Sequence, residues 1–261
     1  MQGTSIEYAT DDRQVSWRGV RMADEDAFSA FLTTDVRSRL RDEEGSTDFE
    51  THLRGLATTG FSRNSLATLL EADVPEERDW AIGEAMAEAY LSHEHQITWP
   101  WNMERDKRTP KASLPGADLI GFKLGNGSAR LALGEVKTST DSSVPPNVMS
   151  GRSGMKHQLD ELAKNLSILV TILKWLLPRC KGTEHEATFN VAVTAFLESG
   201  NKEIALFGVL LRDTQADEKD LRARGQSLAG TIGSPTTCQL VAVYLPCKIA
   251  DLPSRVSEDE S

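Results

Sequence analysis

Asp118, Glu135 and Lys137 are the residues whose types and spacing point most directly to chemistry. Asp118 precedes the apolar run 119–124, and Asn126-Gly127 after that run is a strong β-hairpin signal, because a type I′ turn needs positive φ at both central residues. Such a hairpin brings Asp118 and Glu135 to the same end of two adjacent strands. Two carboxylates at that range suit Mg²⁺ or Mn²⁺, which prefer oxygen ligands.

The returning strand, residues 129–138, places Glu135 and Lys137 on one face, because side chains alternate along a strand. That face begins with leucines, and a charged pair in such a row costs free energy unless it is paired or bound to a metal. The backbone carbonyl of Val136 would add a metal ligand, and Lys137 could orient or deprotonate a metal-bound water or stabilise charge on a phosphate. The trio therefore predicts phosphodiester hydrolysis. The alternative interpretation is a surface ion pair on an edge hairpin.

The elements that must position these residues follow from hydrophobic periodicity and turn signals. We interpret residues 76–250 as one domain. Its order of elements is a helix, three strands, a second helix and further strands, which predicts an α/β fold with a mixed sheet flanked by helices. A polar stretch at 138–154 looks like a mobile loop over the site. The expected elements are helices at 75–93, 155–177 and 213–228, and strands at 97–101, 118–124, 129–138, 189–197, 204–211 and 239–245.

The ends of the chain read as separate from that domain. Residues 1–75 predict an N-terminal α+β appendage: a hairpin of 5–9 with 15–20, a helix after Asp24 whose end carries arginines, a polar connector at 42–51, and one or two helices at 53–70. Residues 251–261 read as a disordered acidic tail.

The composition limits the classes of function that this protein can have. The chain has 261 residues, a formal net charge of -10 and three cysteines in no zinc-binding spacing, and nothing in it resembles a signal peptide or a membrane span, so we expect a cytoplasmic protein without a membrane partner. The charge argues against a free-standing, tight nucleic-acid binder. Local basic residues could still hold DNA phosphates or simply be solvated; the candidates are Arg105, Lys107, Arg108, Lys111, Arg152 and Lys156.

These motifs together resemble the PD-(D/E)xK superfamily of restriction-endonuclease-like nucleases. Pro115-Gly116-Ala117-Asp118 stands for the loose PD motif and Glu135-Val136-Lys137 for ExK, although the proline is not adjacent to the aspartate. The likeness covers roughly residues 76–245 and implies an αβββαβ core. It also assigns an acid on the preceding helix to Glu84 and a polar residue opening the following helix to Gln158, while Leu162 stands where some members carry an aromatic residue.

The resemblance implies a Mg²⁺- or Mn²⁺-dependent deoxyribonuclease. In it Asp118, Glu135, Lys137 and Gln158 would be catalytic, and the metal would be held by Glu84, Asp118, Glu135 and Val136. The layout also resembles the nuclease subunit of helicase-coupled, Hachiman-type anti-phage systems, which implies a helicase or ATPase partner, or a homo-oligomer. A non-catalytic binding subunit and a homodimeric, sequence-specific restriction endonuclease are the alternatives.

Overall fold

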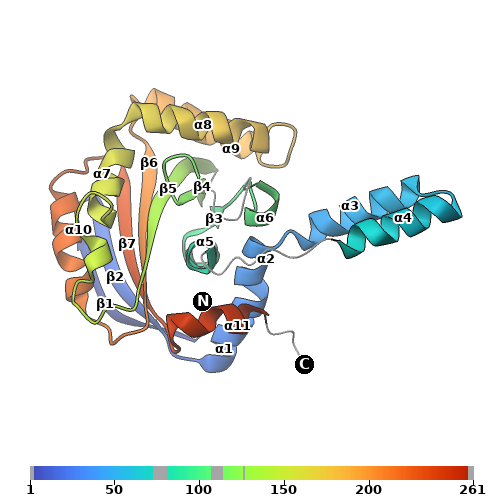
Figure 1. The fold of residues 1–261 in the computed structure, drawn as a ribbon. Helices are drawn as coiled ribbons and strands as arrows, with labels where there is room; N and C mark the ends of the chain where they lie inside the picture. Colours follow the sequence, from blue (N-terminus) through green and yellow to red (C-terminus); the bar gives the residue numbers. More distant parts are fainter. Residues whose placement is uncertain (1–2, 73–80, 107–113, 126, 258–261) are drawn as a thin grey trace.

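A seven-stranded mixed sheet forms the centre of the protein, in a computed structural model that describes residues 3–72, 81–106, 114–125 and 127–257 (Figure 1). The strand order is β1-β2-β7-β6-β5-β4-β3, and helices flank the sheet, which confirms the predicted α/β class. The strands are β1 (Thr4–Asp12), β2 (Val15–Met22), β3 (Ile97–Thr98), β4 (Leu119–Gly125), β5 (Ser128–Ser139), β6 (Ile204–Arg212) and β7 (Thr237–Tyr244).

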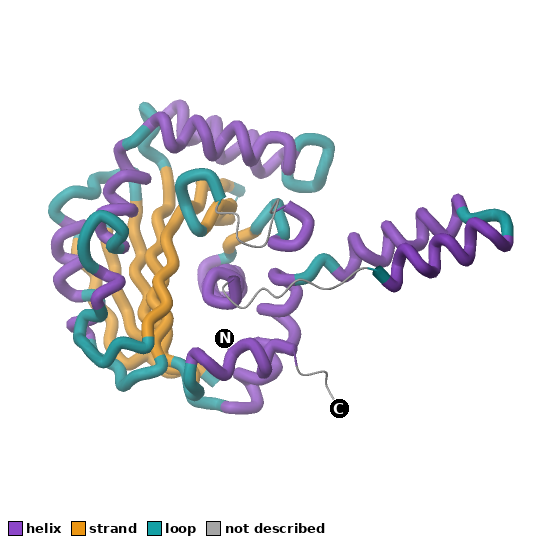
Figure 2. The backbone as a smooth tube through the Cα atoms, in the orientation of Figure 1, coloured by secondary structure: helices purple, strands orange, loops and turns teal. Residues whose placement is uncertain are grey.

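The helices occupy most of the chain between the strands (Figure 2). The α-helices are α1 (Glu25–Ala30), α2 (Arg37–Leu40), α3 (Glu43–Leu56), α4 (Gly60–Glu71), α5 (Ile82–His95), α6 (Met103–Asp106), α7 (Met155–Lys164), α8 (Leu166–Cys180), α9 (Glu186–Glu198), α10 (Arg222–Ala229) and α11 (Leu252–Ser257). A π-helical segment, η1 (Phe31–Val36), joins α1 to α2, and short 3₁₀ turns are η3 (Asn147–Met149), η4 (Glu218–Asp220) and η5 (Ile249–Asp251). Among the described residues, no helix combines the length and apolarity that crossing a membrane would require.

The β4–β5 hairpin forms as predicted. The two strands pair antiparallel, with Leu119 opposite Gly134 at one end and Gly125 opposite Ser128 at the turn, where Gly127 has φ +71°. β5 then pairs in parallel with β6, which is apolar and buried along most of its length, as expected for a strand covered on both faces. β5 is therefore an interior strand.

Two close approaches show which helix covers which face. A Cβ on Gly208 of β6 would lie 2.6 Å from the Met155 Sδ of α7, and Gly208 is the register partner of Glu135. Because register partners point to the same face of a sheet, Glu135 faces α7. A Cβ on Gly83 of α5 would lie 2.5 Å from the Thr138 Oγ1 of β5, so α5 packs on the opposite face.

The prediction that residues 1–75 form an appendage is wrong for the first hairpin. β2 pairs in parallel with β7 from Val15 to Arg21, so β1 and β2 complete the edge of the main sheet, and Trp17 is buried there. Apolar alternation identified both strands, but it carries no information about a partner more than 200 residues away. Within this segment, α3 and α4 alone have the character of an appendage, because neither contains a buried residue and both extend away from the sheet (Figure 1).

Residues 189–197 form helix α9, although they were predicted to be a strand. Their β-branched composition favours a strand, but Phe189, Ala192 and Phe196 are buried at helical spacing, and packing on the sheet overrides the propensity. The predicted helix 155–177 is two helices, because the side chain of Asn165 caps α8 by accepting from the backbone N–H groups of Ser167 and Ile168.

Three further predictions need correction. The supposed connector 42–51 lies largely in α3, and the helix expected at 213–228 consists of the turn η4 followed by the shorter α10. The tail is not disordered from residue 251, because residues 252–257 form α11, with Leu252 and Val256 buried. Residues 258–261 lie outside the described residues, as do 75–80 of the helix predicted at 75–93, of which α5 is the described part.

Candidate metal and catalytic site

The hairpin brings Asp118 and Glu135 together. Both residues lie one position beyond the last paired residues, Leu119 and Gly134, and their carboxyl groups interact. Two backbone contacts hold the aspartate: its N–H donates to the Gly134 carbonyl at 3.0 Å, and its Oδ2 accepts from the Val136 N–H at 2.9 Å. The carboxylate of Asp118 is therefore fixed at the start of β4.

Lys137 joins the pair from the same strand face as Glu135. Its Nζ lies 2.6 Å from Glu135 Oε1, which makes this a short, charge-assisted hydrogen bond. Glu135 is only 3% exposed, whereas Asp118 is half-buried. The ion pair in the alternative interpretation thus exists, but it is buried on an interior strand and does not lie on the surface of an edge hairpin.

The site holds two carboxylates against one ammonium. Burial and, next, the adjacent Asp118 raise the pKa of Glu135 from 4.5 to about 8, because Lys137 opposes the shift only in part. An acid with this pKa resists ionisation at neutral pH unless more positive charge arrives. A divalent cation between the two carboxylates would provide that charge, so the donor set and its electrostatics fit Mg²⁺ or Mn²⁺.

Glu84 does not join this group. It lies half-buried near the start of α5, on the helix that packs against the opposite face of the sheet. In the described part of the chain, no third His, Cys, Asp or Glu gathers with Asp118 and Glu135 into a set that could hold a metal. The backbone N–H of Val136 donates a hydrogen bond to Asp118, and the backbone carbonyl of Val136 remains a predicted metal ligand.

Gln158 is the predicted residue with an unsatisfied atom. It lies on α7 between Met155 and Leu159, the two side chains that pack over Gly208 beside Glu135. Its Oε1 is buried and has no hydrogen-bond partner among the described residues. A buried amide oxygen without a donor is unfavourable, so this atom is available to a water or a ligand entering from the α7 side.

Two of the predicted phosphate-binding residues, Arg105 and Lys156, are paired with acids. Arg105 on α6 pairs with Asp106 at 3.0 Å, and Lys156 on α7 pairs with Asp160 in the next turn. Arg152 is exposed in the loop that leads into α7. Lys107, Arg108 and Lys111 lie outside the described residues, so their prediction is untested.

Arg212 is the main residue that the sequence interpretation missed. It ends β6, has no exposed surface, and binds Asp220 at 3.3 Å together with the backbone carbonyls of Asp141 at 2.8 Å and Ser143 at 3.3 Å. These bonds anchor the loop that follows β5, which was expected to be mobile. The sequence signal that could have identified it is an arginine at the end of an otherwise apolar strand.

A second buried pair was also missed. Glu88 on α5 is fully buried and accepts from Arg39 Nε at 2.7 Å, while the same guanidinium donates to the Trp101 carbonyl at 2.6 Å. The sequence showed only that the first predicted helix ends in arginines. Arg39 fastens α2 to α5, and helix periodicity could not reveal a partner on another helix.

Comparison with known proteins adds no assignment: no protein-family model matches the chain, and no curated protein matches it.

Proposed function

We propose that this protein is a metal-dependent nuclease that hydrolyses DNA phosphodiester bonds at Asp118, Glu135 and Lys137. The observation that carries the proposal is the buried Glu135 beside the half-buried Asp118, with a single ammonium close by, an arrangement expressed in the raised pKa of Glu135. Its support is chemical: two hard oxygen donors on adjacent strands, a lysine in contact with one of them, and an unsatisfied amide oxygen on the helix above.

Each residue then has a defined task. Bound Mg²⁺ or Mn²⁺ would lower the pKa of a coordinated water and withdraw charge from the phosphate. Asp118 and Glu135 would hold the ion, with Asp118 kept in place by the Val136 N–H. Lys137 would donate from its ammonium to the attacking water or to a non-bridging phosphate oxygen, and Gln158 would accept from the same water.

The acidic chain also bears on how DNA would be held. With a formal net charge of -10, the protein has little capacity to neutralise a phosphate backbone by itself. We propose that a helicase or ATPase partner provides this grip and the strand separation, as in a bacterial anti-phage complex. Cleavage that requires such a partner would support this part of the proposal.

The decisive test is plasmid cleavage in Mg²⁺ compared with EDTA, with and without the product of the neighbouring gene. Asp118→Asn keeps an oxygen that can accept from Val136, so it should preserve the fold while reducing cleavage by about 100-fold or more. Glu203→Gln is the matched control, because Glu203 pairs with Arg130 at 2.9 Å elsewhere on the sheet. It should cleave like the unmodified protein.

The same assay separates the alternatives. Metal-independent cleavage, or cleavage that survives Asp118→Asn and Glu135→Ala, would defeat the assignment. DNA binding and biological activity without cleavage would identify a non-catalytic binding subunit. Fixed palindromic cut sites made by a dimer would identify a restriction-type enzyme, and cleavage of RNA alone would replace the DNA assignment.

A further inference from the structure

Helices α3 and α4 form an arm, residues 43–71, that projects from the body of the protein (Figures 1 and 2). Leu53 of α3 and Leu66 and Leu70 of α4 are half-buried. Neither helix contains a buried residue, so contacts within the arm leave much of its apolar surface in water. Such an arrangement is unusual for helices of 14 and 12 residues, whose stability ordinarily comes from burying an apolar face.

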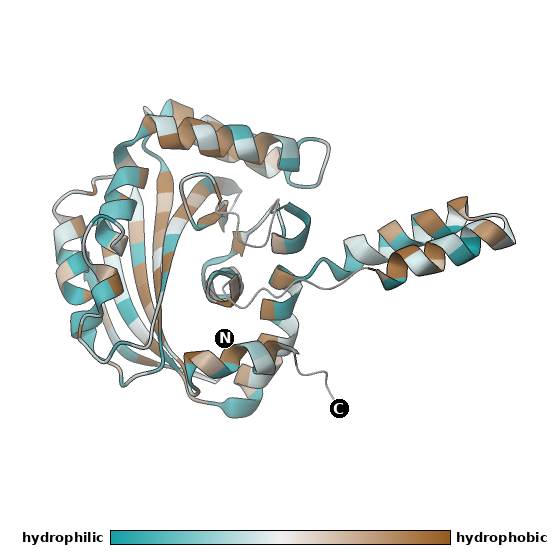
Figure 3. Ribbon diagram, viewed as in Figure 1, coloured by the Kyte–Doolittle hydropathy of each residue, from teal (hydrophilic) through white to brown (hydrophobic). Residues whose placement is uncertain are grey.

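The exposed apolar side chains share one flank of the arm. Phe49 is 59% and Leu56 65% exposed, and they lie on either side of Leu53 along α3 at helical spacing. Leu69 is 60% exposed and lies one turn beyond Leu66, which places it on the corresponding flank of the antiparallel α4. Phe61 at the tip is 84% exposed, and Figure 3 shows hydrophobic residues along the arm.

Charge is also distributed unevenly along the arm. The root, where the arm leaves the body, carries Glu43 and Glu44 at the start of α3 and Glu71 at the end of α4. The tip, where α3 ends and α4 begins, carries Arg63 and also Arg54, which is already paired with Glu50 one turn earlier on α3. One arm thus presents an acidic end and a basic end with apolar side chains between them. When two such arms lie antiparallel, the acidic end of each meets the basic end of the other.

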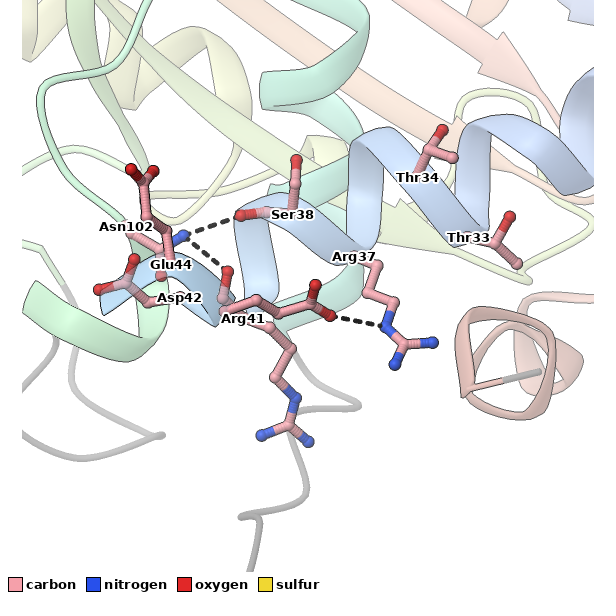
Figure 4. A pocket seen from close by; sticks show the side chains of 9 residues that line it. Thr33, Thr34, Arg37, Ser38, Arg41, Asp42, Glu44 and Asn102 are labelled. Atoms are coloured by element: carbon pink, nitrogen blue, oxygen red, sulfur yellow. Dashed lines mark hydrogen bonds and ion pairs between the residues drawn. The ribbon is translucent and has the colours of Figure 1, made fainter. Parts of the chain in front are cut away.

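The root is hollowed. A pocket of about 540 Å³ lies between α2 and the start of α3 (Figure 4) and is lined by Thr33, Thr34, Arg37, Ser38, Arg41, Asp42, Glu43, Glu44 and Asn102. Its two arginines already have acidic partners, Arg37 with Glu43 at 3.3 Å and Arg41 with Glu104 at 3.2 Å. Glu44 is exposed and makes no ion pair with any described residue. The pocket therefore has an acid available for an incoming cationic side chain.

We propose that two copies of this chain associate through their arms, side by side and antiparallel, so that Arg63 at each tip lies at Glu44 in the root pocket of the other. The apolar flanks cover each other, and the four helices form a bundle with two-fold symmetry. A parallel arrangement would instead place acid against acid and arginine against arginine. The surface charges contribute mainly to orientation, and apolar burial provides most of the affinity.

The first test is the mass of the full chain over a concentration series, by sedimentation or light scattering. We expect the mass to rise from 28.7 kDa towards twice that value. Leu69→Glu should move the midpoint at least tenfold towards higher concentration. Leu197→Glu is the matched control, because Leu197 on α9 is also 60% exposed, and it should leave the midpoint unchanged.

The second test examines orientation. Glu44→Arg and Arg63→Glu should each weaken association, and the double variant should restore it. Under oxidising conditions, a mixture of Glu44→Cys and Arg63→Cys proteins should form disulfide-linked dimers, whereas each protein alone should not, since the two positions lie at opposite ends of an arm roughly 20 Å long.

Specific results would overturn the proposal. A constant mass of 28.7 kDa at every concentration would overturn it. This result would also be obtained if the arm bound a different protein. Equal effects of Leu69→Glu and Leu197→Glu, or cross-linking of either cysteine variant with itself, would overturn it as well. Circular dichroism of each variant shows whether the arm remains helical.

Discussion

Two buried groups of charges in this protein differ in balance. At Arg212, one guanidinium meets one carboxylate, and its remaining donors reach the carbonyls of Asp141 and Ser143 and the hydroxyl of Thr214. At Glu135, two carboxylates share one ammonium. Burial raises the pKa of the acid in both groups, but Arg212 opposes the rise at Asp220, whereas Asp118 adds to it at Glu135.

The difference distinguishes a structural group from a reactive one. A buried pair whose donors and acceptors are matched holds the fold together and has no need of a ligand. A buried group with surplus acid is unfavourable in its fully ionised form until a proton or a metal cation binds. Four experiments measure how far the two groups differ.

The largest effect on stability should follow from unbalancing the matched group. Arg212→Met leaves Asp220 buried without its charged partner and frees the loop after β5, so the free energy of unfolding should fall by about 3–5 kcal/mol. Arg222→Met is the control, because Arg222 pairs with Glu218 at the surface, and its cost should stay below about 1 kcal/mol. Urea unfolding measures both, and equal losses would remove the contrast.

Metal affinity should depend on pH. Because Glu135 has a pKa of about 8 without metal, it carries a proton at lower pH that the cation must displace. The affinity for Mn²⁺ should therefore rise about tenfold per pH unit up to about pH 8 and level off above it. Calorimetry between pH 6 and 8.5 measures this slope, and Glu135→Gln should weaken binding and abolish the slope. An affinity that is constant over this range would contradict the assignment of the proton.

Removing the surplus charge should stabilise the metal-free protein. A carboxyl group whose pKa is raised from 4.5 in the unfolded chain to about 8 in the fold destabilises the native state increasingly as pH rises between those values. Glu135→Gln, which cannot ionise, should raise the free energy of unfolding at pH 8 by up to about 4 kcal/mol, because each unit of pKa shift corresponds to about 1.4 kcal/mol. At pH 4 the difference should vanish. A loss of stability at pH 8 would show that Glu135 is a structural partner of Lys137.

The smallest effect concerns Gln158. Because its buried oxygen has no partner among the described residues, Gln158→Leu should change the free energy of unfolding by less than about 1 kcal/mol. Cleavage should nevertheless fall by roughly tenfold if the amide accepts from the attacking water. Gln239→Leu is the matched control, because Gln239 Oε1 is likewise buried without a partner, and it should leave cleavage unchanged.

Local patterns in the sequence account for much of the site. The Asn-Gly turn predicts the hairpin, and the period of two along 129–138 predicts that Glu135 and Lys137 share a face; both are confirmed. Helical spacing cannot say on which face of the sheet a helix will pack. The family resemblance assigned Glu84 to the metal because it lies on the helix before the strands, although α5 covers the opposite face.

Long-range contacts could not be predicted in the same way. Arg39 and Glu88 lie 49 positions apart, and Arg212 reaches a carbonyl 71 positions away. Nothing in the local sequence relates these residues, because each bond depends on how separate elements dock. The same limit explains why the first hairpin was placed in an appendage and α9 was interpreted as a strand.

The sequence by itself determined the hairpin and the residues that meet on it, because turn geometry and strand alternation act over a few residues. Tertiary structure alone decided that β5 lies inside the sheet, that Glu135 is buried beneath α7, and that its pKa rises to about 8. Desolvation by distant segments sets that value, and no pattern of neighbouring residues encodes it.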